Sequence, residues 1–101
     1  MLALSVSMRF APEDFAEVQQ YLPELTAASR RDEGCVEYWW AVAVDAPHTL
    51  RLFEVWESDE ILQRHLAQPH ERIWLEKYQP RVAAIEVIRY DPTTRGTMGG
   101  S

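Results

Sequence analysis

The sequence predicts an α+β fold whose elements follow the order β-α-β-β-α-β, with the strands in one antiparallel sheet. Apolar and polar residues alternate over residues 2–10, which is typical of a strand. Aromatic and β-branched residues dominate 35–44 and 50–57, which indicates two more strands. Between the strands, apolar residues recur at spacings of three and four, as on one helix face. The chain has 101 residues, the size of one small domain, and this order is the ferredoxin-like arrangement.

The first half of the chain is predicted to form one strand and one helix. One face of the strand 2–10 carries Leu2, Leu4, Val6, Met8 and Phe10. The helix is expected to begin at Pro12, where a missing N–H costs nothing, and to end before Gly34, which suits a left-handed cap. The apolar stripe of this helix consists of Phe15, Val18, Leu22 and Leu25. Pro23 lies within the stripe and is expected to kink the helix or split it in two.

The second half is predicted to contain a hairpin, a helical segment and a last strand. The two central strands, 35–44 and 50–57, are joined by a polar connector. Ser58 is a good N-cap for the helical segment that follows, and Pro69 restarts that segment at a new first turn. The last strand is predicted at 82–90. Residues 1–92 therefore form the domain, and 93–101 are expected to be a flexible C-terminal tail.

The central strand 50–57 is apolar on both of its faces. Leu50 and Leu52 point to one side, and Phe53 and Val55 point to the other. Helices can cover only one face of such a sheet, so the second apolar face predicts a second copy of the chain and a homodimer. The alternative interpretation is that Trp39, Phe53 and Val55 reflect strand propensity alone.

Charge and composition exclude several classes of function. The chain has 10 Lys and Arg against 16 Asp and Glu, a formal charge of −6, which argues against binding to duplex nucleic acid or anionic membranes. No apolar run approaches the length of a membrane span, and the first residues lack a basic leader. The single cysteine fits a reducing compartment, so we expect a cytoplasmic protein.

Familiar cofactor motifs are missing from the sequence. It contains no glycine-rich phosphate loop, no Rossmann fingerprint, no G-x-S-x-G elbow and no CxxC pair. His65 and His70 are five residues apart with Pro69 between them, a poor spacing for two metal ligands on one helix face, even with help from Glu71. We therefore expect neither a bound metal nor a resident cofactor.

Large aromatic side chains are numerous for a chain this short. They are Tyr38, Trp39, Trp40, Trp56, Trp74 and Tyr78. Where the sheet meets the second helical segment they predict an apolar pocket that suits a flat aromatic ligand. The alternative is that each ring is ordinary core packing. Which of Trp39 and Trp40 faces the pocket is left open, because a shift of one residue exchanges them.

His65 is the best candidate for a general base. It follows Ile61 and Leu62 on one helix face, so it is expected to point inward, and a neutral imidazole accepts a proton near neutral pH. The alternative is a buried histidine bonded to a carbonyl group. His70 is a candidate partner or proton donor, or else a solvated residue at a helix start.

Glu54 lies in the middle of an otherwise apolar strand, so its carboxylate needs a partner. Arg51, Arg72 and Arg81 are the candidates for a structural ion pair, which is the favoured interpretation of Glu54.

Three segments together resemble the antibiotic biosynthesis monooxygenase family. They are Asp32-Glu-Gly-Cys-Val-Glu-Tyr38, Leu52-Phe-Glu-Val-Trp-Glu-Ser58 and His65-Leu-Ala-Gln-Pro-His70. The resemblance covers about residues 5–90 and implies a dimeric α/β barrel with a pocket in each subunit. By position, Trp56 and His65 resemble the family's pocket tryptophan and helix histidine, and His70 resembles its second helix histidine.

The resemblance implies a cofactor-free oxygenase, in which a base removes a phenolic proton and the substrate anion reduces oxygen directly. The chain contains no asparagine, whereas the haem-degrading and anthrone-oxygenating members use one near the tryptophan. Haem degradation is therefore not expected.

The predicted function is cofactor-independent monooxygenation of a small quinol, phenolic or polyketide-type aromatic substrate, with molecular oxygen as the second substrate. His65, Trp56 and His70 form the predicted catalytic set, and Tyr38, Trp40, Glu54 and Trp74 the predicted substrate-binding set. Two alternatives remain at this stage: a non-oxidative isomerase or cyclase on the same scaffold, and a dimer that binds a small molecule without catalysis.

Overall fold

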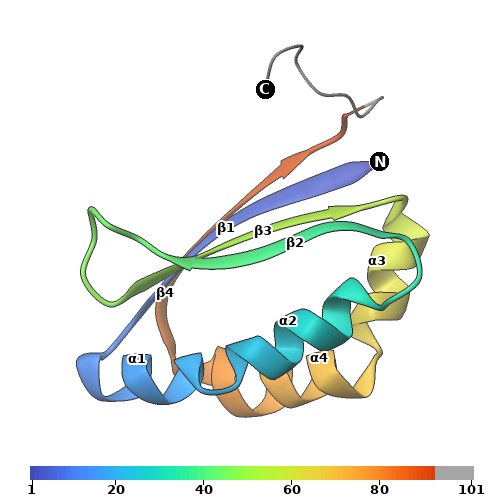
Figure 1. Cartoon of the computed structure of the whole chain (residues 1–101). Helices are drawn as coiled ribbons and strands as arrows, with labels where there is room; N and C mark the ends of the chain where they lie inside the picture. Colours follow the sequence, from blue (N-terminus) through green and yellow to red (C-terminus); the bar gives the residue numbers. More distant parts are fainter. Residues whose placement is uncertain (93–101) are drawn as a thin grey trace, which may run out of the picture.

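The computed structural model describes residues 1–92, and the predicted tail at 93–101 lies outside these residues (Figure 1). The elements are β1 (Leu2–Phe10), α1 (Pro12–Gln19), α2 (Leu22–Arg30), β2 (Cys35–Val42), β3 (Thr49–Trp56), α3 (Asp59–Leu66), α4 (Pro69–Ile73), the π-helical turn η1 (Trp74–Tyr78), the 3-10 turn η2 (Gln79–Arg81) and β4 (Val82–Tyr90). The predicted order of strands and helical segments is confirmed. The hairpin strands are offset slightly from the prediction, since β2 ends at Val42 and β3 ends at Trp56.

The four strands form one antiparallel sheet in the order β2-β3-β1-β4, and the helices lie together on one of its faces (Figure 1). The register pairs Leu2 with Trp56 and Val6 with Leu52, so these four side chains share the helix-facing side. This is the predicted α+β fold.

Prolines divide the helical segments. Pro23 lies in the first turn of α2, where its missing N–H needs no acceptor, and the chain turns between α1 and α2 just before it. The second segment is divided in the same way, with Pro69 opening α4 and Pro80 in η2. Each break redirects the chain, and the break at Pro69 separates the two histidines of the second segment into different helices.

The core lies between the sheet and the helices. Its centre contains the most completely buried large side chains, which are Leu2, Phe10, Val18, Leu25, Tyr38, Leu50, Trp56 and Trp74. Burial of apolar area at roughly 25 cal/mol per Å² is the main source of stability in such a layer. The predicted aromatic side chains therefore form a large part of the core.

The other face of the sheet carries apolar side chains that nothing in the described chain covers. Trp39, Phe53, Ile88 and Tyr90 are exposed there, and β4 is exposed along nearly its whole length. The predicted two-faced apolar pattern is thus present, and the homodimer stays a prediction. Within residues 1–92, no helix is long and apolar enough to cross a membrane.

Candidate functional site

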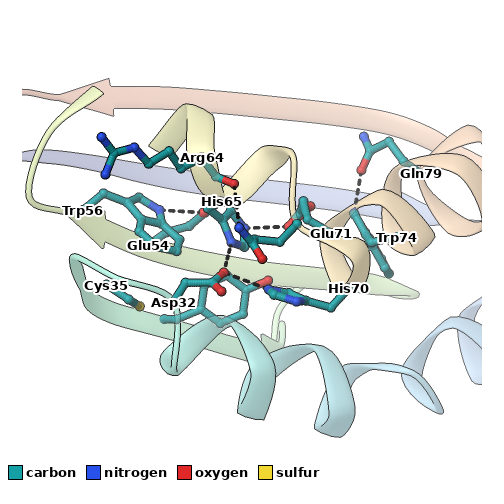
Figure 2. Close-up of polar contacts among 12 residues, drawn as sticks. Asp32, Cys35, Glu54, Trp56, Arg64, His65, His70, Glu71, Trp74 and Gln79 are labelled. Atoms are coloured by element: carbon teal, nitrogen blue, oxygen red, sulfur yellow. Dashed lines mark hydrogen bonds and ion pairs between the residues drawn. The ribbon is translucent and has the colours of Figure 1, made fainter. Parts of the chain in front are cut away.

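The site is centred on His65, which lies near the end of α3 and is only 2% exposed. Ser58 caps the start of this helix by accepting the N–H of Ile61 at 3.1 Å. Each nitrogen of the His65 ring meets a carboxylate oxygen: Nδ1 lies 2.7 Å from Asp32 Oδ2, and Nε2 lies 2.6 Å from Glu71 Oε2 (Figure 2). The imidazole is therefore clamped between two carboxylates.

Asp32 is fixed by the turn that joins α2 to β2. Its N–H donates to Ser29 O at 3.1 Å, and its carbonyl accepts the N–H of Cys35 at 3.2 Å. Gly34 completes the turn with a φ of 77°, a conformation that favours glycine. A Cβ at Gly34 would lie 2.6 Å from Ile61 Cγ2, so this turn packs directly against α3. The close approach brings Asp32 to the His65 ring.

His70 reaches the same carboxylate from the next helix. Its Nε2 lies 2.7 Å from Asp32 Oδ2, so one oxygen atom joins both histidines (Figure 2). The backbone of His70 is fixed by Tyr21, whose hydroxyl donates to His70 O at 2.9 Å. The side chain of His70 is 16% exposed, which makes it the more accessible imidazole of the pair. We refer to His65, Asp32 and His70 as the bridged histidine pair.

Two aromatic rings pack against the His65 ring. Trp56 stacks on it at a centroid distance of 4.3 Å, and Tyr38 meets it edge-on at 5.9 Å. Tyr38 also contacts Trp40, whose Nε1–H donates to the Tyr38 hydroxyl at 3.1 Å. Trp74 lies against Trp40 at 5.0 Å and donates its own N–H to Gln79 Oε1 at 2.9 Å. The structure thus brings the predicted catalytic and substrate-binding side chains into one cluster.

The choice between the two adjacent tryptophans of β2 is settled by the register. Trp40 pairs with Leu52 and faces the helices, whereas Trp39 pairs with Phe53 on the open face and is 57% exposed. The guanidinium of Arg30 lies 4.8 Å from the centre of the Trp39 ring.

Glu54 has a different partner from the arginines predicted for it. It is buried, and one of its oxygens accepts the Nε1–H of Trp56 at 2.9 Å. Arg51 is three positions away on the same strand, so it points to the opposite face and donates to Ser5. Arg72 and Arg81 bind other acidic side chains, namely Glu76 for Arg72, and Asp14 and Glu17 for Arg81. The predicted ion pair is therefore wrong.

The unusual electrostatics of the site follow from burial and from these contacts. Burial raises the pKa of Glu54 to about 7, although the hydrogen bond from Trp56 opposes the shift. Burial alone would lower the pKa of His65, but the hydrogen bonds with Glu71 and Asp32 and the charges of Glu71 and Glu54 outweigh it and raise that pKa. An imidazolium at His65 donates one N–H to each carboxylate, and both carboxylates keep a cationic partner.

Two hollows lie near the cluster. The one that reaches His65 has a volume of about 270 Å³ and is lined by Arg31, Asp32, Glu33, Arg64, His65 and Gln68. The larger groove, about 440 Å³, lies between the α1–α2 segment and β2, and Trp40 is the one predicted aromatic that lines it. The buried indole rings are packed, Trp40 against Trp74 and Trp56 against His65. The hollow beside the imidazole is thus polar, in contrast to the predicted aromatic-lined pocket.

Sequence reasoning missed Asp32 and the position of Glu71. Asp32 belongs to the segment that carries the family resemblance, but it is 33 residues from His65 in the sequence. Glu71 follows His70 directly, and the sequence suggests it only as a further metal donor. A useful signal is that a buried histidine needs hydrogen-bond partners, and acidic residues in neighbouring turns are the natural candidates.

Several solved structures are similar to this chain. A candidate antibiotic biosynthesis monooxygenase from Deinococcus radiodurans has a TM-score of 0.84 and 20% identity, with 99% of this chain and 100% of that chain covered. A protein from Mycobacterium tuberculosis has a TM-score of 0.84 and 20% identity, with coverage of 95% and 98%. A candidate antibiotic biosynthesis monooxygenase from Nitrosomonas europaea has a TM-score of 0.84 and 15% identity, with coverage of 93% and 100%. At these identities the likeness establishes the fold.

Among curated proteins, none matches the sequence significantly. The model of one protein family, antibiotic biosynthesis monooxygenase, matches residues 1–77, which is most of the chain. That segment includes the turn with Asp32, the strand with Glu54 and Trp56, and both helices that carry the histidines. The chain belongs to the antibiotic biosynthesis monooxygenase family.

Proposed function

We propose that this protein is a cofactor-independent monooxygenase that acts on a small electron-rich aromatic substrate: a quinol, a phenol or a polyketide-type ring. The main support is the bridged histidine pair, which lies beside a hollow lined by two arginines. Family membership supports the reaction class. The chemistry of the pair supports a reaction that begins with removal of a proton from the substrate.

The proton acceptor in this proposal is the bridged histidine pair. The substrate occupies the hollow that Asp32 and His65 line, and its phenolic hydroxyl reaches past Asp32 to His70, the more exposed imidazole, which accepts the proton. Asp32 stabilises the positive charge that forms, because its carboxylate lies 2.7 Å from His70 Nε2. His65 holds Asp32 from the other side, and Trp56 fixes the His65 ring by stacking. His65 and Trp56 then position the acceptor, and His70 contacts the substrate.

The substrate supplies all the electrons for the reduction of oxygen. With a quinol, both hydroxyls become carbonyls, one ring C–H becomes C–OH, and the second atom of O₂ leaves as water. Arg31 and Arg64 line the hollow and place positive charge beside the phenolate and the reduced oxygen that form on this path. The reaction therefore requires no flavin, haem or metal.

The predicted substrate-binding residues have unequal parts in this proposal. Tyr38, Glu54 and Trp74 are buried in the cluster and support the histidine pair from behind. Trp40 lines the larger groove, which Tyr38 separates from His65. We therefore place the reacting hydroxyl at the polar hollow and treat the groove beside Trp40 as the competing location.

An oxygen electrode with reduced naphthoquinone tests the proposal, with autoxidation in buffer subtracted. We expect uptake by the wild type, and a kcat about 100-fold lower in His70→Gln, which is typical for loss of a general base. His48→Asn is the matched control, because His48 is exposed in the β2–β3 loop, and its kcat should not change. Uptake no faster than in buffer, or product formed at the same rate without oxygen, would refute the proposal.

A second pair of variants locates the substrate. Arg31→Gln should raise KM if the reacting hydroxyl enters the polar hollow, whereas Trp40→Leu should leave KM nearly unchanged. The reverse pattern would place the substrate in the larger groove.

We further propose that the protein is a homodimer joined through the open face of the sheet. This proposal is supported by the exposed apolar side chains Trp39, Phe53, Ile88 and Tyr90. Water is a poor environment for so many large apolar groups on one face, and a second copy of the same face would cover them.

A further inference from the structure

The side chains of the bridged histidine pair are also suited to bind a ligand, and this inference does not depend on the proposed oxygenation. We propose that Asp32, His65 and His70 form a binding site for a divalent first-row transition metal ion such as Zn²⁺. Two imidazole nitrogens and one carboxylate oxygen are donors that such ions prefer. The three donor atoms all lie within 4.8 Å of one another, which is close enough for one ion to contact them together.

The distances within the pair fit this proposal with a small adjustment. Asp32 Oδ2 lies 2.7 Å from His65 Nδ1 and 2.7 Å from His70 Nε2. Metal–ligand bonds of about 2.0–2.1 Å place neighbouring ligand atoms about 2.9–3.4 Å apart, depending on whether the geometry is octahedral or tetrahedral. Each of these two separations therefore has to widen by less than about 1 Å, and the two histidine nitrogens, which lie within 4.8 Å of each other, have to reach the same range. Rotation of the partly exposed His70 and Asp32 side chains can supply these changes.

The surroundings of His65 are those of a metal ligand in other proteins. Its second nitrogen, Nε2, lies 2.6 Å from Glu71 Oε2. A carboxylate in this position fixes which nitrogen carries the proton, orients the ring and increases the basicity of the nitrogen that faces the metal. Trp56 stacks on the ring and prevents its rotation, so His65 is already oriented toward Asp32 (Figure 2).

The electrostatics and access also favour a cation. Asp32 and Glu71 both contact His65, so two carboxylates share one buried imidazole. A divalent ion in contact with Asp32 balances these two negative charges. The hollow beside Asp32 and His65 gives the ion a path from solvent, and three protein ligands leave a further position for water.

The five-residue separation of His65 and His70 in the sequence argues against a metal site on one helix face. His65 and His70 lie on different helices, because Pro69 ends one and begins the next, so they need not share one helix face. Asp32 comes from the α2–β2 turn and completes the set from a distant part of the chain. The fold therefore supplies the convergence that the spacing of the two histidines does not indicate.

Isothermal titration calorimetry with ZnCl₂ on untagged, chelator-treated full-length protein tests the proposal. We expect one ion per chain and an affinity at least about 100-fold lower in Asp32→Asn and in His70→Gln, each of which removes one ligand. Asp45→Asn and His48→Asn are the matched controls, since both residues lie exposed in the β2–β3 loop, and both variants should bind as the wild type does.

Cobalt provides a readout that does not depend on enzymatic activity. Co²⁺ bound by two imidazoles and a carboxylate should give visible absorption bands in the wild type that disappear in His70→Gln. The circular dichroism of His70→Gln should remain native, which separates loss of a ligand from loss of the fold. Equal affinity in all five proteins, or binding that is lost equally in the two loop controls, would overturn the proposal.

Discussion

Replacement of Glu54 by glutamine offers a quantitative test of the electrostatics of the site. Glu54 is buried on the helix-facing side of β3, and its contact is with Trp56 Nε1–H rather than with a cation. Glutamine keeps a carbonyl oxygen that can accept this hydrogen bond, and it has almost the same shape. The substitution therefore removes the ionisation of residue 54 and leaves its packing intact.

The size of the effect follows from the shift in pKa. Burial raises the pKa of Glu54 from 4.5 to about 7 in the folded protein. One pKa unit corresponds to about 1.4 kcal/mol, so ionised Glu54 lowers the free energy of unfolding by about 3 kcal/mol. The direction of this pH dependence follows from proton binding in the folded and unfolded states. Below pH 4.5 Glu54 is protonated in both states, so the penalty is absent. The penalty grows between pH 4.5 and 7, and it is complete above pH 7.

Urea denaturation of wild type and Glu54→Gln at pH 5 and pH 8 measures this difference. The variant should be more stable than the wild type by up to about 3 kcal/mol at pH 8, and by no more than about 1 kcal/mol at pH 5. Glu57→Gln is the control, because Glu57 is exposed just after the same strand. The reasoning is refuted if Glu54→Gln is destabilised, or if it changes stability equally at both pH values.

Two further predictions concern the turn beside Asp32 and the open face of the sheet. Gly34→Ala should lower the free energy of unfolding by about 1–3 kcal/mol, since alanine at a φ of 77° is strained and its Cβ would collide with Ile61. An unchanged urea midpoint would contradict this. Phe53→Glu should convert the proposed dimer to a monomer in sedimentation velocity, whereas Val44→Glu, in the exposed β2–β3 loop, should not. A wild type that sediments as a monomer at all concentrations would disprove the dimer.

Sequence periodicity was sufficient to predict the elements of the fold. Alternation over residues 2–10 and the helical stripe that contains Val18 and Leu25 reflect which side chains reach the core, and burial is the main driving force of folding. Pro23 was recognised as a break because the loss of a backbone donor is a local property. The structure contains the predicted order of elements for these reasons.

The site was less predictable, because its contacts join distant segments. His65 could be placed inside from its neighbours on α3, but its link to Asp32 depends on how closely the α2–β2 turn approaches that helix. Strand alternation would have shown that Arg51 cannot reach Glu54, since the two positions face opposite ways. The choice between Trp39 and Trp40 needed the register of β2 on β3.

Oxygen uptake during a zinc titration shows whether the histidine pair bridged by Asp32 accepts the substrate proton. Chelator-treated protein is assayed with reduced naphthoquinone while ZnCl₂ is added and occupancy is followed by calorimetry. Zinc bound at the nitrogens that face Asp32 replaces the carboxylate contact on which proton acceptance depends. We predict uptake above the buffer rate in the metal-free protein and its loss in proportion to zinc occupancy. Full activity with the site saturated by zinc would mean that the pair does not accept the proton.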